Sequence, residues 1–383
     1  MTGSLLVVVH RRTTKRALAV LLTAIVVGLL CLAGCARTPP DPGPPRSTQS
    51  HRASATPDGL MLDGKPWWPA GFNAYQLSTD WSVNRGCGAQ VDADGYFAKL
   101  PPRALTRFNL YSVFAVDKRS GLLDFGPIDR VFAAAARHRQ MVLPVLTGGS
   151  GDCEDERFKE RDFYVDGWRT DERVGGLSYA EWIEIALTRW HDEPSIAGWE
   201  LVGEPEASEC GATSCDWRHR TCPADATAVL RSFFDQAGAH LRDFDADRPI
   251  FSGLVGGDQC GLAGPGFTAV GRSAGLDVLD FHDYRSDVDS ESGPAGSNLR
   301  ARLEQARELG KPLVVNEIGI HAGSCGSVAS RAEQFETIIA RHRAAGVAGA
   351  LLWSFVPDPR GTECTYDIGP NDPAWNVVRE NAS

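Results

Sequence analysis

The chain has 383 residues, 43% of them hydrophobic, which is enough to bury a large core in one or two domains. Its formal net charge is −10, and four of its basic residues are concentrated before position 17. An acidic chain without a basic stripe argues against nucleic acid as a partner and favours neutral or cationic ligands.

The first 35 residues have the plan of a signal peptide, with the basic segment RRTTKR followed by an apolar run. Small residues precede Cys35 in LAGC, which resembles the lipobox of bacterial lipoproteins, where the cysteine is acylated. A transmembrane anchor is the alternative, but about 16 apolar residues are short for a membrane span. We therefore expect an exported protein with lipidated Cys35 on the extracytoplasmic face, a Pro/Ser-rich linker at 36–58 and one domain at 59–383.

Eight cysteines remain in the predicted domain, and an even number in an exported chain indicates up to four disulfides, whose pairing stays open. Zinc in the cluster of Cys210, Cys215 and Cys222 is disfavoured because the cluster lacks a CxxC pair. We expect neither a metal nor another cofactor. The eight cysteines are Cys87, Cys153, Cys210, Cys215, Cys222, Cys260, Cys325 and Cys364.

Apolar runs alternate with segments of helical periodicity about eight times along the chain. This alternation predicts a (β/α)8 barrel, with a doubly wound open sheet as the alternative. A hairpin with a DG turn at 60–68 precedes the first strand, and all eight cysteines fall between a strand and the next helix, on loops that share one face of a barrel. Later strands are expected at 104–114, 141–149, 196–206, 250–257, 275–284, 311–319 and 347–355, and helices at 127–140, 178–194, 226–244, 299–310, 327–346 and 373–379.

Two apolar runs end in a carboxylate. IAGWELVGEPE carries Glu204 directly before Pro205, and KPLVVNEIG carries Glu317. In parallel β/α proteins the chemistry lies at the carboxyl ends of the strands, so we expect the two glutamates to meet there. Two carboxylates suit hydrolysis of a glycosidic bond: one protonates the departing oxygen and the other attacks the anomeric carbon, with retention if they lie about 5 to 5.5 Å apart.

The blocks WELVGEPE and KPLVVNEIG resemble family five of the glycoside hydrolases, in the clan of (β/α)8 barrels whose catalytic glutamates end strands four and seven. The resemblance runs from about residue 59 to 379 and implies a poly- or oligosaccharide substrate. It implies Glu204 as acid/base and Glu317 as nucleophile. Other positions that match the family's site are Asn73, Arg107, His282, Tyr284 and Trp353.

One position departs from the family, which normally has asparagine before the acid/base, where its amide bonds the sugar 2-hydroxyl; this chain has Gly203. Because that contact strengthens in the transition state, its loss favours a different sugar ring. We therefore expect a β-galactofuranoside of a bacterial cell-envelope galactan. An endo-β-mannanase or β-glucanase is the alternative, and a non-catalytic carbohydrate-binding lipoprotein is the alternative of another class.

Some further residues are assigned from their place in the predicted elements. Glu200 is expected on the opposite face of its strand from Glu204, in a structural role. Trp81, Trp168 and Trp217 fall in predicted loops and are candidates for lining sugar subsites.

Overall fold

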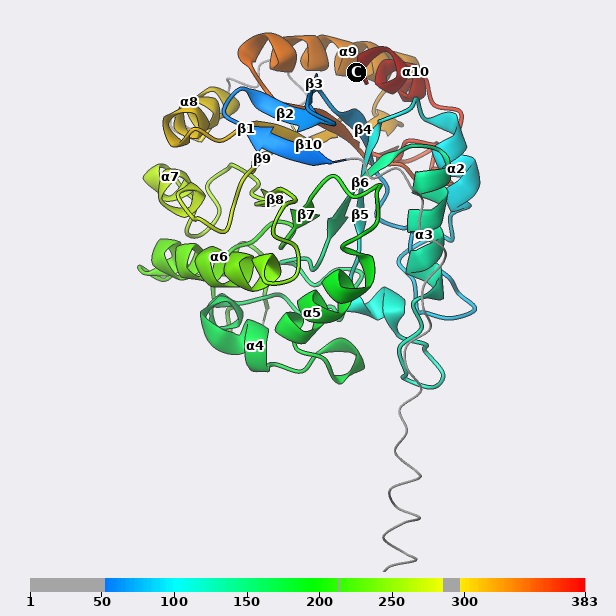
Figure 1. The fold of residues 1–383 in the computed structure, drawn as a ribbon. Coiled ribbons are helices and arrows are strands. Elements are labelled where there is room, and N and C mark those ends of the chain that lie inside the picture. Colours follow the sequence, from blue (N-terminus) through cyan, green and yellow to red (C-terminus); the bar gives the residue numbers. More distant parts are fainter. Residues whose placement is uncertain (1–51, 213, 285–296, 383) are drawn as a thin grey trace, which may run out of the picture. The chain divides into compact units, whose positions relative to one another are not determined.

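The computed structural model describes residues 52–212, 214–284 and 297–382 (Figure 1). The predicted signal peptide, the predicted lipidation site Cys35 and most of the predicted linker lie outside these residues. Every helix in the described part of the chain is too short or too polar to span a bilayer.

Eight parallel strands form the centre of the domain, in the order β8-β7-β6-β5-β4-β12-β10-β9. A bridge between Phe251 of β8 and Val278, the residue before β9, joins the two ends of this order, as a barrel requires. The predicted (β/α)8 barrel is therefore confirmed over the open sheet. The strands are β4 Ala70–Asn73, β5 Leu105–Asn109, β6 Met141–Val145, β7 Trp199–Glu200, β8 Ile250–Phe251, β9 Leu279–Asp283, β10 Leu313–Gly319 and β12 Ala350–Trp353.

Helices surround the strands and cover their outer faces (Figure 1). Every residue of β4, β6, β9 and β10 is buried, as expected for parallel strands packed on both sides. The helices are α2 Ala93–Lys99, α3 Gly126–Arg137, α4 Trp168–Thr170, α5 Tyr179–Trp190, α6 Ala226–Arg242, α7 Pro265–Gly271, α8 Leu299–Leu309, α9 Val328–Ala345 and α10 Ala374–Asn381. Short helical turns occur at Ser112–Ala115, Phe163–Gly167 and Val174–Gly176.

Local sequence signals set several helix ends. Ser178 and Glu181 form a capping box at the start of α5, and Ser327 caps α9 through the backbone N–H of Ser330. Gly310 ends α8 in the left-handed conformation that glycine adopts without steric cost. These signals explain why the long helices lie where the sequence predicts them.

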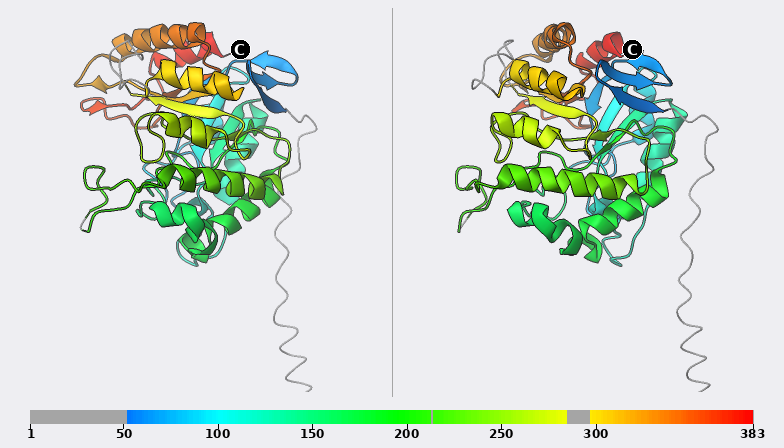
Figure 2. Two further views of the ribbon diagram at one scale, coloured as in Figure 1. Left: turned by 90° about the vertical axis from the view of Figure 1, so that its left-hand side faces the viewer. Right: turned by 60° about the vertical axis from the view of Figure 1, so that its left-hand side comes forward.

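A small antiparallel sheet lies at the end of the barrel opposite the long loops (Figure 2). It consists of β1 Ala53–Thr56, β2 Gly59–Leu62 and β3 Lys65–Trp67, and the predicted DG turn joins β2 to β3. Its apolar side chains belong to one buried cluster with the amino-terminal parts of the barrel strands. The predicted linker, 36–58, extends too far. β1 pairs with β2, so the folded domain begins by Ala53 and not at 59.

All eight cysteines of the predicted domain form disulfides on the loops that follow the barrel strands. Cys87–Cys153 joins the loops after β4 and β6, and Cys222–Cys260 joins the loops after β7 and β8. Cys325–Cys364 joins the loops after β10 and β12, next to the antiparallel pair of β11 Ala322–Gly323 and β13 Cys364–Thr365, and Cys210–Cys215 closes a turn after β7. The three cysteines considered for zinc are therefore disulfide-bonded. Disulfides there stiffen the loops at the carboxyl ends of the strands.

Candidate active site

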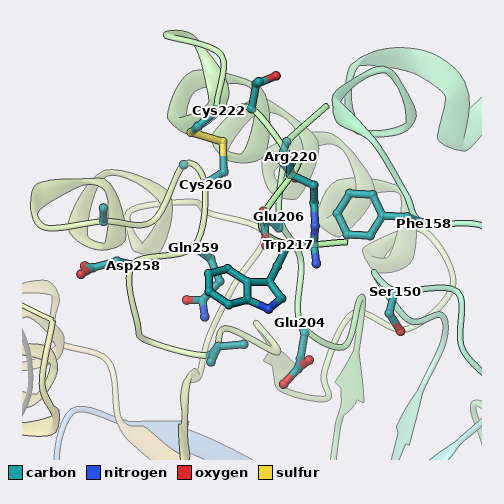
Figure 3. A pocket seen from close by; sticks show the side chains of 15 residues that line it. Ser150, Phe158, Glu204, Glu206, Trp217, Arg220, Cys222, Asp258, Gln259 and Cys260 are labelled. Atoms are coloured by element: carbon teal, nitrogen blue, oxygen red, sulfur yellow. Dashed lines mark hydrogen bonds and ion pairs between the residues drawn. A yellow bond between two sulfur atoms is a disulfide. The ribbon is translucent and has the colours of Figure 1, made fainter. Parts of the chain in front are cut away.

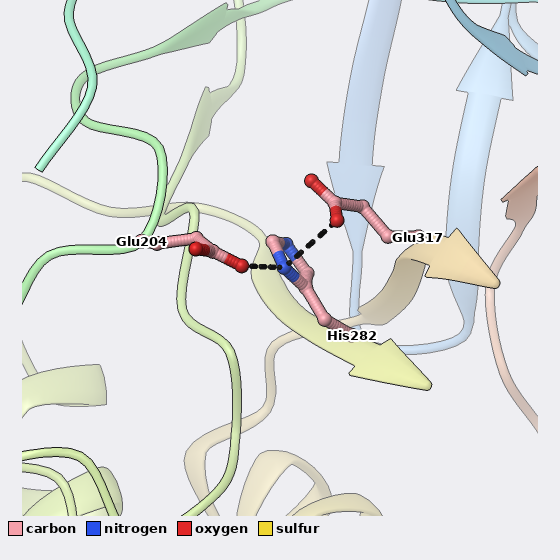
Figure 4. Close-up of side chains that lie close together, drawn as sticks. All are labelled: Glu204, His282 and Glu317. Atoms are coloured by element: carbon pink, nitrogen blue, oxygen red, sulfur yellow. Dashed lines mark hydrogen bonds and ion pairs between the residues drawn. The ribbon is translucent and has the colours of Figure 1, made fainter. Parts of the chain in front are cut away.

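Glu204 and Glu317 meet at the carboxyl ends of the barrel strands, as the sequence predicts. Glu204 follows β7 with φ = 55°, an uncommon conformation for a residue other than glycine, and its N–H donates to the carbonyl of Gly253 (3.0 Å). One carboxylate oxygen of Glu204 lies within 4.8 Å of one oxygen of Glu317 (Figure 4). Retaining glycosidases have about 5 to 5.5 Å between these groups and inverting ones about 6.5 to 9.5 Å, so the spacing matches retention.

Glu317 is buried and held by two donors. Arg107 Nη1 donates to its Oε1 (2.6 Å), and the Tyr284 hydroxyl donates to its Oε2. Burial raises the pKa of Glu317, and the charges of His282 and Arg107 oppose that rise. The two donors fix the direction in which the carboxylate points.

Two buried residues, Glu200 and Asn73, hold Arg107 in position. Glu200 accepts two hydrogen bonds from it, at 2.7 and 2.6 Å, in the bidentate geometry that makes such pairs strong. The Asn73 side-chain oxygen accepts a third (2.8 Å), and the Asn73 amide donates to the carbonyl of Asn316 (2.7 Å). Glu200 has the structural role expected of it, but it faces the site and not the opposite side of the sheet. Asn73 supports Arg107 from a buried position.

His282 lies between the two glutamates, with its Nδ1 2.8 Å from Glu204 Oε1 and 3.4 Å from Glu317 Oε2 (Figure 4). Burial lowers the pKa of His282, but the charge of Glu317 and the hydrogen bond with Glu204 outweigh it and raise the pKa overall. Burial likewise raises the pKa of Glu204, yet the hydrogen bond from His282 leaves that pKa below its ordinary value. The free site thus favours Glu204 as a carboxylate and a proton on the imidazole beside it.

These protonation states differ from those that the expected roles require, since an acid at Glu204 must hold a proton and a nucleophile at Glu317 must be ionised. The difference arises because Nδ1 of His282 faces both carboxylates, so the three groups share protons and titrate together. The same three groups lie close enough to hold a metal ion. Both oxygens of Glu317, however, already accept hydrogen bonds from Arg107 and Tyr284, which favours a role for this carboxylate without a metal.

A second polar layer supports the site, and no role for it was predicted from the sequence. Asn316, next to Glu317, donates to Asp280 and to Glu200 (3.3 Å). The Ser252 hydroxyl and the Gly253 N–H also donate to Asp280, at 2.9 and 2.7 Å. Burial, together with the charge of Glu200, raises the pKa of Asp280 to about 7. Asp280 could have been found from its place two residues before His282, on the same face of β9.

The four tryptophan candidates lie in four different surroundings. Trp353 ends β12 and stacks on Tyr75 with ring centroids 5.7 Å apart, and Tyr284 packs edge-on against it at 6.4 Å. Trp168 is 1% exposed and belongs to the hydrophobic core, so the prediction that it lines a subsite is wrong. Trp217 lines a pocket beside Glu204 (Figure 3). Trp81 is exposed on the loop after β4.

The fold and the site together define a class: a (β/α)8 barrel with a carboxylate pair at the carboxyl ends of its strands, spaced as in retaining glycosidases. No model of a known protein family matches the chain. The chain is similar in sequence to curated proteins and in fold to solved structures.

The similar proteins bear consistent names. Putative mannan endo-1,4-β-mannosidase 5 of Oryza sativa subsp. japonica is 24% identical over 79% of this chain and 69% of its own length. Mannan endo-1,4-β-mannosidase 3 of Arabidopsis thaliana is 25% identical over 86% of this chain and 90% of its own. The crystal structure of endo-1,4-β-mannanase from Rhizomucor miehei matches with a TM-score of 0.63 at 19% identity, over 87% of this chain and 98% of that one. The structural likeness confirms the predicted fold.

Proposed function

We propose that this glycoside hydrolase cleaves internal β-1,4 linkages of a mannan by double displacement, with retention of configuration. The enzyme class agrees with the names of the relatives from rice and Arabidopsis. Those names do not support the expected β-galactofuranoside, and they favour the alternative, an endo-β-mannanase. The observation that carries the mechanism is the separation of Glu204 and Glu317, whose oxygens lie within 4.8 Å, close to the spacing of retaining glycosidases.

Each residue of the site has a part in the proposed reaction. Glu317 attacks the anomeric carbon while Arg107 and Tyr284 hold its carboxylate in place. Glu204 protonates the departing oxygen and then removes a proton from the water that releases the sugar. The ring of Trp353 offers a flat apolar face to the sugar.

His282 is the proposed source of the proton that Glu204 needs, because its Nδ1 lies 2.8 Å from Glu204 Oε1 and its pKa is raised. Transfer of the Nδ1 proton to Glu204 produces the working pair, a protonated acid beside a nucleophile, Glu317, that stays ionised. The bound sugar favours this transfer because positive charge develops next to the imidazole in the oxocarbenium-like transition state.

The test replaces each glutamate by alanine and offers azide as an external nucleophile. Glu204→Ala and Glu317→Ala should each lower kcat on mannan by about 10³-fold or more while the thermal unfolding temperature stays within a few degrees. With an aryl β-mannoside, whose leaving group departs without a proton from Glu204, azide should restore turnover in both variants. The product should be the β-mannosyl azide with Glu204→Ala, because the glycosyl-enzyme still forms, and the α-anomer with Glu317→Ala, because azide then attacks directly.

Glu206→Ala is the matched control, since this carboxylate lies two residues from Glu204 and pairs with Arg220. It should keep turnover of a small activated mannoside. Full activity of Glu317→Ala would contradict the nucleophile assignment. A wild-type protein that binds mannan without hydrolysing it would instead favour the non-catalytic binding protein.

We also propose that the protein works outside the cytoplasm, which its four disulfides support. Lipidation of Cys35 stays a prediction.

A further inference from the structure

The backbone just before Glu204 is held by the loop after β6. Gly203 donates its N–H to the carbonyl of Thr147 (2.9 Å) and accepts a hydrogen bond from the N–H of Gly149 (2.8 Å), so the pairing of β6 with β7 resumes beyond the end of both strands. On the other side, the N–H of Glu204 donates to the carbonyl of Gly253 (3.0 Å). Glu204 has a positive φ, and an uncommon conformation of this kind persists only where its surroundings hold it. The residues that fix this loop therefore also fix the proposed acid.

A buried ion pair, Lys159 with Glu154, is bonded to three consecutive residues of this loop. The Thr147 hydroxyl donates to the carboxylate of Glu154 and lies 2.9 Å from both of its oxygens. The Lys159 ammonium donates to the carbonyl of Gly148 (2.7 Å), and the Lys159 backbone N–H donates to the carbonyl of Gly149 (2.8 Å). The two charged side chains also bond each other, with Lys159 Nζ 2.6 Å from Glu154 Oε2. One ion pair therefore fixes the whole segment that pairs with the residue before the acid.

Stability alone does not account for this ion pair. The side chain of Lys159 is 1% exposed and that of Glu154 is 7% exposed, so both charges have lost most of their water. The Lys159 ammonium also faces the ring of Phe163, whose centroid lies 5.5 Å away. Burial lowers the pKa of Lys159, and the charge of Glu154 opposes that shift. An ion pair buried in this way often adds no net stability, but its charge-assisted hydrogen bonds hold their partners in a single geometry.

The loop also fits closely against the proposed acid. A Cβ on Gly149 would lie 2.4 Å from the carbonyl oxygen of Glu204, and a Cβ on Gly148 would lie 2.8 Å from the Tyr111 hydroxyl. Both glycines are thus in contact with their neighbours, and neither position has room for a side chain. A displacement of the loop toward Glu204 is therefore blocked by contact, and a displacement away from it breaks the hydrogen bonds with Lys159.

We propose that Lys159 and Glu154 are positioning residues for the acid/base, Glu204. They act through the backbone of residues 147–149, which keeps Gly203 in place and so directs the Glu204 carboxyl at the glycosidic oxygen. This inference rests on the proposed function. Because the ion pair acts on the acid, its loss should slow the reaction only where the leaving group needs a proton.

Two substrates with the same donor part separate this effect from a general loss of structure. Phenyl β-mannobioside releases a strongly basic phenolate that needs a proton, whereas 2,4-dinitrophenyl β-mannobioside releases a weakly basic one that departs without it. The double variant Lys159→Met/Glu154→Gln removes both charges together, so no unpaired charge stays buried. It should lower kcat/KM on the phenyl substrate about tenfold or more, because general acid catalysis contributes about 10² to 10⁴-fold. Its kcat/KM on the dinitrophenyl substrate should equal that of the wild type.

The matched control is Arg248→Met/Asp245→Asn, which removes an ion pair at the opposite end of β7. Arg248 bonds Asp245 (2.9 Å) and the backbone carbonyls of Ile196 (3.2 Å) and Glu193 (2.8 Å), so it supports the chain before this strand, away from Glu204. Any loss of kcat/KM in this variant should be equal on the two substrates. Thermal unfolding of both double variants should show that they are folded.

Thr147→Val provides a milder test in case the double variant at Lys159 and Glu154 does not fold. It removes only the hydroxyl that donates to Glu154 and keeps both charges paired. It should lower kcat/KM on the phenyl substrate by about threefold, because one hydrogen bond of the network is lost, and should leave the dinitrophenyl substrate unaffected. Equal losses on the two substrates, or wild-type values on both, would overturn the inference.

Glu204→Ala distinguishes failure of this inference from failure of the proposed function. This variant should lose far more kcat/KM on the phenyl substrate than on the dinitrophenyl substrate, and adding Lys159→Met/Glu154→Gln to it should cause no further loss, because the acid is already absent. A further loss would show that the ion pair acts elsewhere and would overturn the inference. Equal losses in Glu204→Ala would reject the assignment of the acid itself. A selective loss in Glu204→Ala, without one in the ion-pair variants, would keep the proposed function and reject the inference.

Discussion

Gly203, the residue before the proposed acid, is tied to the ion pair below the site. A Cβ placed on Gly203 would lie 3.2 Å from Arg107 Nη2 and 3.6 Å from Glu200 Oε1. Any larger side chain here would project onto the bidentate pair that positions Arg107. The glycine is therefore compatible with an intact catalytic pair, and it does not by itself require a different sugar ring.

The hydrogen bond from Tyr284 to Glu317 leads to a prediction about pH. It stabilises the carboxylate and so lowers the pKa of Glu317 against the larger effect of burial, which raises it. The nucleophile must be ionised, so kcat/KM should fall as the pH falls through this pKa. In Tyr284→Phe the acidic limb of the pH profile of kcat/KM should move up by about one pH unit. A hydrogen bond to a charged group contributes about 1.5 kcal/mol, which corresponds to about one pKa unit.

The control for this prediction is Tyr366→Phe. Tyr366 packs edge-on against Tyr284 at 5.2 Å, but the structure gives it no hydrogen bond to Glu317. Its acid limb should match that of the wild type in a pH profile of kcat/KM. A limb that stays in place in Tyr284→Phe, or moves to lower pH, would show that the hydroxyl does not control ionisation of Glu317.

At the scale of elements, long apolar runs were predictable and short irregular elements were not. The predicted fourth strand spans 196–206, but β7 itself is Trp199–Glu200, because the chain turns away before Glu204 with its positive φ. The helices α2 and α7 were not predicted, since each has seven residues and contains glycine, which weakens helical propensity.

The candidate site was predictable to the same degree. A carboxylate at the end of an apolar run is visible in the sequence, so Glu204 and Glu317 could be named as candidates. The pairing of Arg107 with Glu200 could not be predicted. The strands β5 and β7 are not neighbours, and their side chains meet only inside the closed barrel. The pocket walls could not be predicted either, since they depend on which cysteines pair.

The sheet of β1 to β3 yields a prediction for the start of the domain. β1 pairs with β2 from Ala53 to Thr56, and the buried Ala53 belongs to the cluster that includes Leu105 and Met141 of the barrel. A chain that starts at 59 loses this strand. Its free energy of unfolding should be about 2 kcal/mol lower than that of a chain that starts at 52, because hydrogen bonds and apolar burial are lost.

Denaturant unfolding of the two truncated chains measures this difference directly, with the full-length chain for reference. Activity should be similar in both, because this sheet lies at the end of the barrel opposite the long loops (Figure 2), and Glu204 belongs to the loop after β7. Equal stability of the two chains would mean that β1 adds nothing and that 59 is an adequate boundary.

At the scale of the whole molecule, exposed carboxylates and buried titratable groups make the stability depend on pH in opposite ways. Exposed carboxylates paired with arginine, such as Asp225 with Arg161, have lowered pKa values, so their contribution is lost only as the pH falls below about 4. Asp280, Glu317 and His282 have raised pKa values, so their contribution is lost as the pH rises. The domain should therefore be most stable in mild acid.

Asp280 allows this to be tested with one substitution. Its pKa rises from 3.8 in the unfolded chain to about 7 in the fold, so the folded state binds more protons between these values and its stability falls as the pH increases. The side-chain oxygen introduced in Asp280→Asn can still accept the hydrogen bonds of the Ser252 hydroxyl and the Gly253 N–H. Because that side chain cannot ionise, the variant should lose less thermal stability than the wild type between pH 5 and about pH 7.5. The exposed Asp152→Asn should follow the wild-type curve, and parallel curves for Asp280→Asn and the wild type would mean that the protonation of Asp280 does not change on folding.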